Sequence, residues 1–208
     1  MNKLIMMPLL CSSFLFLLAC GSSEINSGTP KQDAAQTSAQ NNIAQSYRVE
    51  AIAQLNEPWA ITSLPDQRLL ITERKGQLKL FDPKTKSIVN VSAVPAVSYG
   101  GQGGLGDVIL HPDFQNNHWL YLSYASKGQD GYGAEISRAK LDLSNPAQPK
   151  LTDLKTIWQQ VPKVSGQGHY GHRMLFGSDG KLWVSSGERQ KFDPAQDMQS
   201  NLGKILRL

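Results

Sequence analysis

From Tyr47 onward the sequence consists of short apolar segments separated by turn-forming residues, and this pattern constrains the fold most. Apolar and polar residues alternate within the segments, and Asp, Gly and Pro cluster between them. Period-two alternation is typical of β-strands that bury one face, and closely spaced turns favour antiparallel pairing. We therefore predict an all-β fold. Strands are expected near residues 47–53, 59–61, 68–72, 77–81, 87–91, 108–110, 119–124, 182–184 and 205–208.

A weak repeat organises these strands into larger units. A turn with Asp66, Asp113 or Asp179 precedes an apolar segment each time, at spacings of 47 and 66 residues. Units of about 40–50 residues, some enlarged by loops, are typical of β-propeller blades. A β-sandwich with similar turns is the alternative. The body, residues 47–208, has room for about three blades, fewer than the usual four to eight. We therefore expect either a partial propeller or a fold that does not close.

The first 46 residues are predicted to be a targeting signal followed by a flexible tether. Lys3 precedes an apolar run that is short for a membrane-spanning helix, and residues 17–20 (LLAC) resemble a bacterial lipobox. We predict a signal peptide over residues 1–19 and lipidation of Cys20, which would anchor the chain at a membrane. A plain signal peptide with a chance cysteine is the alternative. Residues 20–46 are rich in Ser, Gln, Asn and Ala, which predicts a disordered tether.

Composition excludes several classes of protein. The two cysteines cannot form a disulfide scaffold. The 21 basic and 17 acidic residues are scattered, and no basic block tracks along the chain. Nucleic acid is therefore not an expected partner.

Three loop segments carry residues that could do chemistry. The first, residues 99–107, is rich in glycine around Gln102, but a strand-like segment follows it, so it does not read as a phosphate loop. The second, residues 165–176, contains His169 and His172. In a strand, His169 would share a face with Arg173 and His172 would take the other. Neutral histidine is a suitable general base, although a structural role is the commoner one.

The third segment, residues 185–197, is a charged loop that follows a predicted strand. It contains Glu188 and Arg189, whose carboxylate and guanidinium could bind a polyol or an anion. An ordinary solvated loop between strands is the alternative for this segment.

Taken together, these segments resemble the soluble quinoprotein sugar dehydrogenases of the glucose/sorbosone dehydrogenase family, particularly its aldose sugar dehydrogenase branch. The matching stretches occur in family order over nearly all of residues 47–208. They are residues 57–60 (EPWA), 69–76 (LLITERKG), 101–107 (GQGGLGD), 110–114 (LHPDF), 120–124 (LYLSY), 169–176 (HYGHRMLF), 186–189 (SGER), 195–197 (AQD) and 202–208 (LGKILRL).

The resemblance implies a six-bladed β-propeller that holds pyrroloquinoline quinone (PQQ) and calcium. It implies oxidation of an aldose at its anomeric carbon to the lactone, with electrons passed on to an acceptor that the sequence does not identify. His169 matches the family's catalytic base, Gln102 a residue lining the cofactor and sugar site, and Arg189 a further polar residue facing that site. Gly168 stands where some members have an acidic residue, which bears on substrate preference.

The resemblance also implies that the sequence is the N-terminal part of such a propeller. The metal ligands and most PQQ contacts are expected beyond Leu208, so the chain is expected to be inactive alone. Lipidation of Cys20 would place it in a bacterial cell envelope. Gly21 stands where Asp signals inner-membrane retention in some bacteria, which favours the outer membrane, facing the periplasm.

Two other functions stay open at this point. A non-catalytic envelope propeller could bind glycans or partner proteins. A metal-dependent lactonase on a similar propeller would need acidic metal ligands, and the sequence shows none at suitable spacing.

Overall fold

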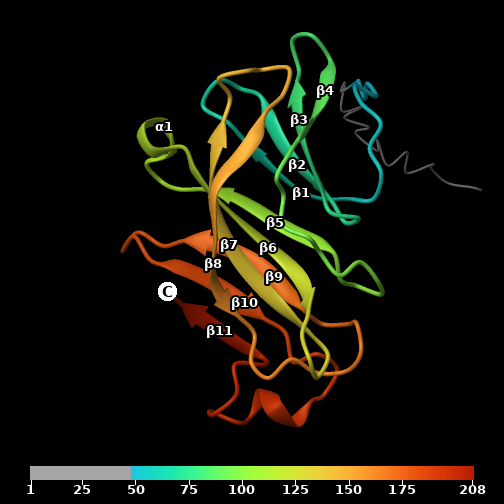
Figure 1. Cartoon of the computed structure of the whole chain (residues 1–208), viewed down its shortest axis with the longest axis vertical. Coiled ribbons are helices and arrows are strands. Elements are labelled where there is room, and N and C mark those ends of the chain that lie inside the picture. Colours follow the sequence, from blue (N-terminus) through green and yellow to red (C-terminus); the bar gives the residue numbers. More distant parts are fainter. Residues whose placement is uncertain (1–47) are drawn as a thin grey trace, which may run out of the picture. The chain divides into compact units, whose positions relative to one another are not determined.

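The computed structural model describes residues 48–208, which fold into three antiparallel sheets (Figure 1). The first sheet is a meander of β1 (Pro58–Ser63), β2 (Leu69–Glu73), β3 (Gln77–Asp82) and β4 (Ser87–Val91). The second is a meander of β5 (Leu105–Leu110), β6 (Trp119–Lys127), β7 (Tyr132–Asp142) and β8 (Lys150–Gln159). The third has the order β11-β10-β9, with strands β9 (Gly171–Phe176), β10 (Leu182–Ser186) and β11 (Lys204–Arg207).

Helical structure in this part of the chain is limited to two short segments. The helix α1 (Phe114–Asn117) separates β5 from β6, and the 3₁₀ turn η1 (Asp193–Ala195) lies between β10 and β11. Among the residues described, no helix is long and apolar enough to cross a membrane. The predicted signal peptide, Cys20 and the tether lie outside the described residues, so these three stay predictions.

The predicted all-β fold with about three blades is confirmed, and the Asp repeat marks the same hairpin in each sheet. Asp66 lies between β1 and β2, Asp113 between β5 and β6, and Asp179 between β9 and β10. The side chains of Asp66 and Asp179 each accept a hydrogen bond, at 3.0 Å, from the backbone N–H two residues later. This local turn is a property of Asp itself, which is why the sequence showed it.

One predicted strand is wrong. Residues 48–55 form no strand, despite the alternation seen at 47–53. The apolar side chains there do not enter a core: Val49 is 84% exposed and Ile52 is 49% exposed. Alternation predicts a strand only where a partner strand and a buried face are both available.

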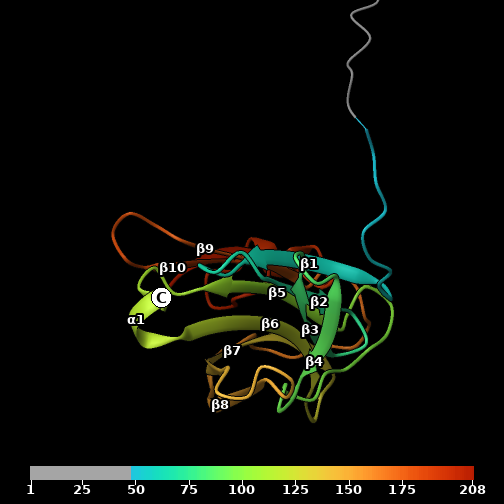
Figure 2. The same cartoon turned by 90° about the horizontal axis from the view of Figure 1, so that it is seen from above.

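Hydrophobic clusters hold the three sheets together. The first and second sheets share a core that includes Leu70, Leu78, Leu105, Leu120 and Leu122. The second and third sheets share another, which includes Ile136, Met174, Leu182 and Val184. The second sheet contributes to both cores, and Figure 2 shows its strand β5 next to β1 of the first sheet and β9 of the third. Burying one such side chain contributes about 1.5–3 kcal/mol.

The first strands of successive sheets contact one another. β1 contacts β5, and β5 contacts β9. The loop before β5 and the loop before β9 therefore emerge close together, although they are far apart in the sequence. This arrangement positions the site described below.

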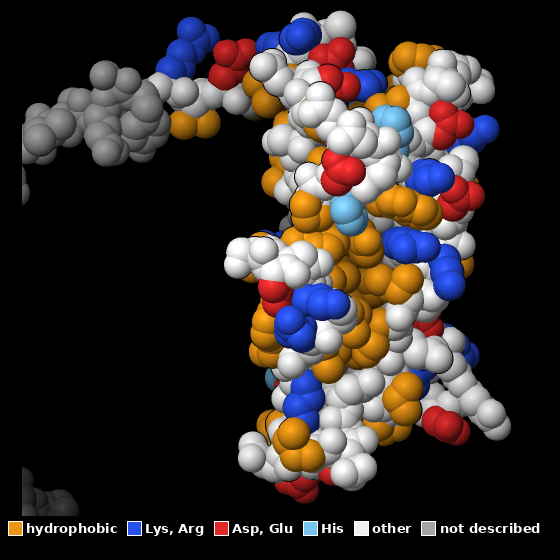
Figure 3. All heavy atoms as spheres, turned by 90° about the vertical axis from the view of Figure 1, so that its left-hand side faces the viewer, with side chains coloured by type: hydrophobic (Ala, Val, Ile, Leu, Met, Phe, Trp, Pro, Cys, Tyr) orange, Lys and Arg blue, Asp and Glu red, His pale blue; other side chains and the backbone are white. Residues whose placement is uncertain are grey.

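The third sheet turns its other face outward. Leu175 and Trp183 are directly paired across β9 and β10, and Ile205 lies on the neighbouring strand β11. Their exposed fractions are 67%, 38% and 70%. Figure 3, which views the molecule from the left of Figure 1, shows a hydrophobic surface area flanked by Lys and Arg side chains.

The Thr72 hydroxyl connects the first two sheets near the glycine-rich loop. Replacing it therefore tests how much this contact stabilises the fold. Thr72 is fully buried, donates to the carbonyl of Gly106 at 2.7 Å and accepts from the N–H of Ala60 at 3.0 Å. We expect Thr72→Val to lower the free energy of unfolding by about 1–3 kcal/mol, because two buried polar groups lose their partner.

Urea unfolding measures this effect, and Thr85→Val is the matched control. Thr85 is exposed in the turn between β3 and β4. Its replacement should change the free energy of unfolding by less than about 0.5 kcal/mol. Equal effects of the two replacements would contradict the assigned role of Thr72.

Candidate functional site

The glycine-rich loop before β5 and the loop before β9 meet at Gln102 and His169. The Gln102 side-chain oxygen accepts a hydrogen bond from the His169 N–H at 2.8 Å. The Gln102 N–H in turn donates to the carbonyl of Gln167 at 2.8 Å. The structure thus brings together two of the predicted site residues, which are 67 positions apart.

Arg74 supports the glycine-rich loop from the first sheet. Its guanidinium donates to the carbonyls of Gly101 and Gly103, the two residues that flank Gln102. Glu57 pairs with the same guanidinium at 3.3 Å and accepts from the Tyr99 hydroxyl at 2.8 Å. These contacts hold the Gln102 loop in place beside His169.

Glu188 is the direct partner of the His169 ring. The carboxylate Oε1 of Glu188 lies in hydrogen-bond contact with Nδ1 of His169. This hydrogen bond lowers the pKa of Glu188 below its ordinary value, so the carboxylate is ionised at neutral pH. An ionised carboxylate only accepts, so Nδ1 carries the proton and, in the neutral ring, Nε2 keeps a free lone pair. The imidazole is 44% exposed, so a ligand can reach it from outside the protein.

The backbone on either side of Gly187 fixes this pair. The Gly187 N–H donates to the carbonyl of Tyr170 at 3.0 Å, and the Arg189 N–H donates to that of His169 at 3.2 Å. The buried side chain of Gln160 donates to the Gly187 carbonyl at 2.8 Å. A Cβ on Gly187 would lie 1.9 Å from the carbonyl oxygen of His169, so only glycine fits there.

Arg189 lies beneath this pair, not beside the His169 ring. Its side chain is fully buried and donates to the backbone carbonyls of Gly166, Gly168 and Tyr132. In this structure the guanidinium binds the protein's own backbone. Its predicted contact with a cofactor or substrate stays a prediction.

Of the two histidines, His172 lies in β9 on the face opposite Arg173, as strand alternation predicts, and His169 does not follow the prediction. His169 precedes β9 and has a left-handed backbone with φ of 47°, so the expectation that it shares a strand face with Arg173 is wrong. His172 is in β9, 3% exposed, and stacks on Tyr170 with ring centroids 5.4 Å apart. Burial lowers the pKa of His172 to about 4, so this ring is neutral at ordinary pH. Neither of its ring nitrogens has a partner within residues 48–208.

Sequence reasoning missed the role of Glu188. The carboxylate was visible in a charged loop, but its pairing with His169 depends on the register between β9 and β10, which shifts between Val184 and Ser186. The one signal in the sequence is that Glu188 closely follows the end of β10 and His169 closely precedes the start of β9, which are neighbouring strands.

The part of the chain described holds no cluster of three His, Cys, Asp or Glu side chains that could bind a metal. Asp107 is a buried carboxylate whose pKa is raised by burial, but it accepts from the backbone N–H of Met174 and of Val108. It therefore has a structural role between β5 and β9.

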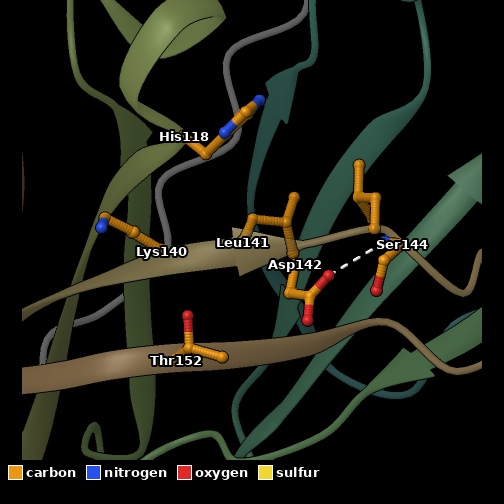
Figure 4. Close-up of a pocket in the computed structure, with 7 residues that line it drawn as sticks. His118, Lys140, Leu141, Asp142, Ser144 and Thr152 are labelled. Carbon is orange, nitrogen blue, oxygen red and sulfur yellow. Dashed lines mark hydrogen bonds between the residues drawn. The ribbon is translucent and has the colours of Figure 1, made fainter.

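A cavity of about 430 Å³ lies at the far end of β7, away from His169 (Figure 4). Its two charged side chains, Lys140 and Asp142, already have partners. Asp142 accepts from the N–H of Ser144 at 2.9 Å, and Lys140 pairs with Asp153 at 3.1 Å. Its lining includes none of the residues predicted for the site.

Comparison with known proteins decides the family. The family model described as Glucose / Sorbosone dehydrogenase matches residues 55–208. The chain belongs to the glucose/sorbosone dehydrogenase family. The resemblance to this family that the sequence motifs indicated is thereby confirmed. The β-propeller architecture is also that of its structural neighbours.

Two curated relatives show how much of the family's length is present. The aldose sugar dehydrogenase YliI of Escherichia coli (strain K12) is 39% identical over 158 residues, which cover 74% of this chain and 41% of that protein. Quinoprotein glucose dehydrogenase B of Acinetobacter calcoaceticus is 27% identical over 183 residues, covering 76% of this chain and 38% of the relative. The chain thus spans about two-fifths of the length of these relatives.

A solved structure agrees with this assignment. The PQQ-bound form of aldose sugar dehydrogenase from Streptomyces coelicolor matches with a TM-score of 0.67 and 33% identity, over 74% of this chain and 45% of that one. These relatives are oxidoreductases that act on sugars, and the fold of this family member is theirs over the matched part.

The buried His172 makes a prediction about stability and pH. Its pKa of about 4 in the folded state lies below the ordinary 6.5, so the unfolded chain takes up the proton first as the pH falls. This residue leaves stability unchanged above pH 6.5 and lowers the free energy of unfolding between pH 6.5 and 4, by up to about 3 kcal/mol.

We expect His172→Phe, which keeps an aromatic ring against Tyr170, to flatten the pH dependence of the free energy of unfolding in that range. Urea unfolding across the range measures it. The control His118→Asn, at an exposed position, should keep the wild-type dependence because His172 is intact. An unchanged slope in His172→Phe would show that another group is responsible.

Proposed function

We propose that the protein oxidises an aldose at its anomeric carbon to the lactone, with PQQ as the hydride acceptor and His169 as the general base. The observation that carries this proposal is the exposed imidazole of His169, oriented by Glu188 through Nδ1 and by Gln102 through its backbone N–H. A quinoprotein relative and a PQQ-bound structural neighbour support the choice of cofactor.

Each residue has a defined task in this proposal. The free lone pair on Nε2 of His169 takes the proton from the anomeric hydroxyl. The Glu188 carboxylate keeps the proton on Nδ1 and stabilises the imidazolium that forms. Gln102 fixes the backbone N–H of His169 and so the direction of the ring. When bound, PQQ supplies the two-electron acceptor for the hydride that leaves the same carbon.

The described residues fit the reacting side of such a cofactor. The His169 ring is 44% exposed, and a Cβ added to Gly166 in the same loop would meet no heavy atom within 4 Å. No side chain therefore fills the space beside that part of the loop. The carboxylates of PQQ need cationic or amide donors, and we propose that these come mostly from outside residues 48–208.

Calcium, the lipid anchor and the electron acceptor belong to the same proposal. Calcium would act as a Lewis acid on the quinone oxygen, with ligands outside the part of the chain described. Lipidation of Cys20 would hold the protein at the bacterial outer membrane, facing the periplasm, where an acceptor still to be identified would take the electrons. We also propose that the 208-residue chain does not turn over by itself, since it spans 41% of the length of its E. coli relative.

The test is a dye-linked assay of the full-length protein with glucose and other aldoses, after addition of PQQ and calcium. We expect His169→Gln to lower kcat by about 10²–10⁴-fold, because the general base is lost. Glu188→Gln should lower kcat by less, because the amide oxygen can still accept from Nδ1. The control His118→Asn should keep the wild-type kcat.

Two results would contradict the proposal. One is the absence of PQQ-dependent activity on every aldose, which together with retained glycan binding would favour a non-catalytic propeller. The other is an unchanged kcat in His169→Gln.

A further inference from the structure

We propose that Arg189 is a positioning residue that fixes the loop of residues 166–169, and with it the His169 ring, and that it does not contact the sugar or the cofactor. This inference rests on the proposed function of His169. It gives Arg189 a different role from the ligand contact that the sequence suggested.

The Arg189 side chain is fully committed to the backbone around it. Its Nε donates to the carbonyl of Gly168 and one terminal nitrogen to that of Gly166, both at 2.7 Å. The other terminal nitrogen donates to the carbonyl of Tyr132 at the start of β7. The guanidinium also lies 3.7 Å from the centre of the Tyr170 ring. One planar group thus joins the His169 loop to the second sheet.

The charge of Arg189 strengthens these contacts. The side chain is 0% exposed, and none of the ion pairs among residues 48–208 includes it. A buried cation must be compensated, and here carbonyl dipoles do so through charge-assisted hydrogen bonds. Moving the guanidinium toward a ligand would break these hydrogen bonds.

The loop that Arg189 holds needs outside support. His169 has φ of 47°, in the left-handed region that residues with a Cβ rarely adopt. Gly166 has φ of 90°, and the space where its Cβ would lie is empty. Packing therefore does little to hold this part of the loop. Two of the three carbonyls that Arg189 binds, those of Gly166 and Gly168, flank Gln167, whose own carbonyl accepts from the N–H of Gln102.

A lysine at position 189 cannot make the same three hydrogen bonds. An ammonium is a compact donor on a flexible stem and cannot present the planar fork that reaches the carbonyls of Gly166, Gly168 and Tyr132 together. Arg189→Lys therefore keeps the charge and removes most of the positioning, which separates the two contributions.

The experiment compares Arg189→Lys and Arg189→Met with the wild type in the full-length protein, at a temperature where all are folded by circular dichroism. Turnover is expressed per PQQ-loaded site. We expect kcat to fall by roughly 10- to 100-fold in both variants, with KM for glucose and Kd for PQQ unchanged, because a displaced base slows chemistry without weakening binding. Arg138→Met is the control, since Arg138 stacks on Trp119 at 4.4 Å in the middle of β7. It should keep the wild-type kcat.

A second readout does not depend on activity. Hydrogen exchange of the His169 backbone amide in the protein without PQQ should become faster in Arg189→Met, because its hydrogen bond to Gln102 opens more often. Amides of the first sheet should exchange as in the wild type. This measurement keeps its meaning even if His169 proves not to be the base.

The outcomes separate the alternatives. A rise in KM or in Kd for PQQ would show that Arg189 contacts a ligand, which overturns the proposal. A wild-type kcat per loaded site would show that it serves stability only, which also overturns it. Unchanged exchange of the His169 amide would contradict the positioning role directly. If turnover falls in Arg189→Met but not in His169→Gln, Arg189 still positions the loop, and the proposal that His169 is the general base is rejected.

Discussion

The close approach of Gly187 to the backbone of His169 is the constraint on which the site depends. A Cβ at position 187 would overlap the His169 carbonyl oxygen, so glycine lets the segment after β10 lie directly against the segment before β9. The two residues that follow take different partners, at the point where the chain leaves β10 and enters a turn in which Arg189 has a left-handed φ of 62°. Glu188 reaches the His169 ring near the surface, and Arg189 turns inward beneath the same loop. One short segment thus supplies both the partner of the ring and the support of its backbone.

The three sheets explain why these loops meet. β5 contacts both β1 and β9, so the loops that precede β5 and β9 emerge at neighbouring positions. Arg74, which follows β2, therefore reaches the carbonyls on either side of Gln102, and the Gln102 side chain reaches the backbone of His169 before β9. The proposed base, His169, lies on a loop, but this loop is tied to a strand within a few residues, which is how a propeller combines a rigid scaffold with a variable site.

Local features of the sequence predicted most of the fold. The turns at Asp66 and Asp179 form through hydrogen bonds within two residues of the Asp, so this signal survives in the sequence. The strand expected at residues 47–53 failed because strand formation also needs a partner, which alternation does not report. The third sheet was recognisable from its turn and its apolar segments.

The site was less predictable, because its contacts depend on register between distant residues. Family resemblance predicted His169 and Gln102 as site residues, but nothing local showed that the Gln102 side chain would bind the backbone and not the ring of His169. A charged residue in a polar loop also suggests exposure, whereas Arg189 is fully buried among carbonyls. These features arise from the pairing of residues 169–170 with 187–189, which no single stretch of sequence contains.

The most direct test of the central claim is a crystal structure of the full-length protein with PQQ and an aldose bound. The measurement is the distance from Nε2 of His169 to the anomeric hydroxyl oxygen. We expect it to be about 2.6–3.2 Å, with Glu188 still on Nδ1. An Nε2 that faces away from the sugar, or a different side chain at hydrogen-bond distance from that hydroxyl, would contradict the account.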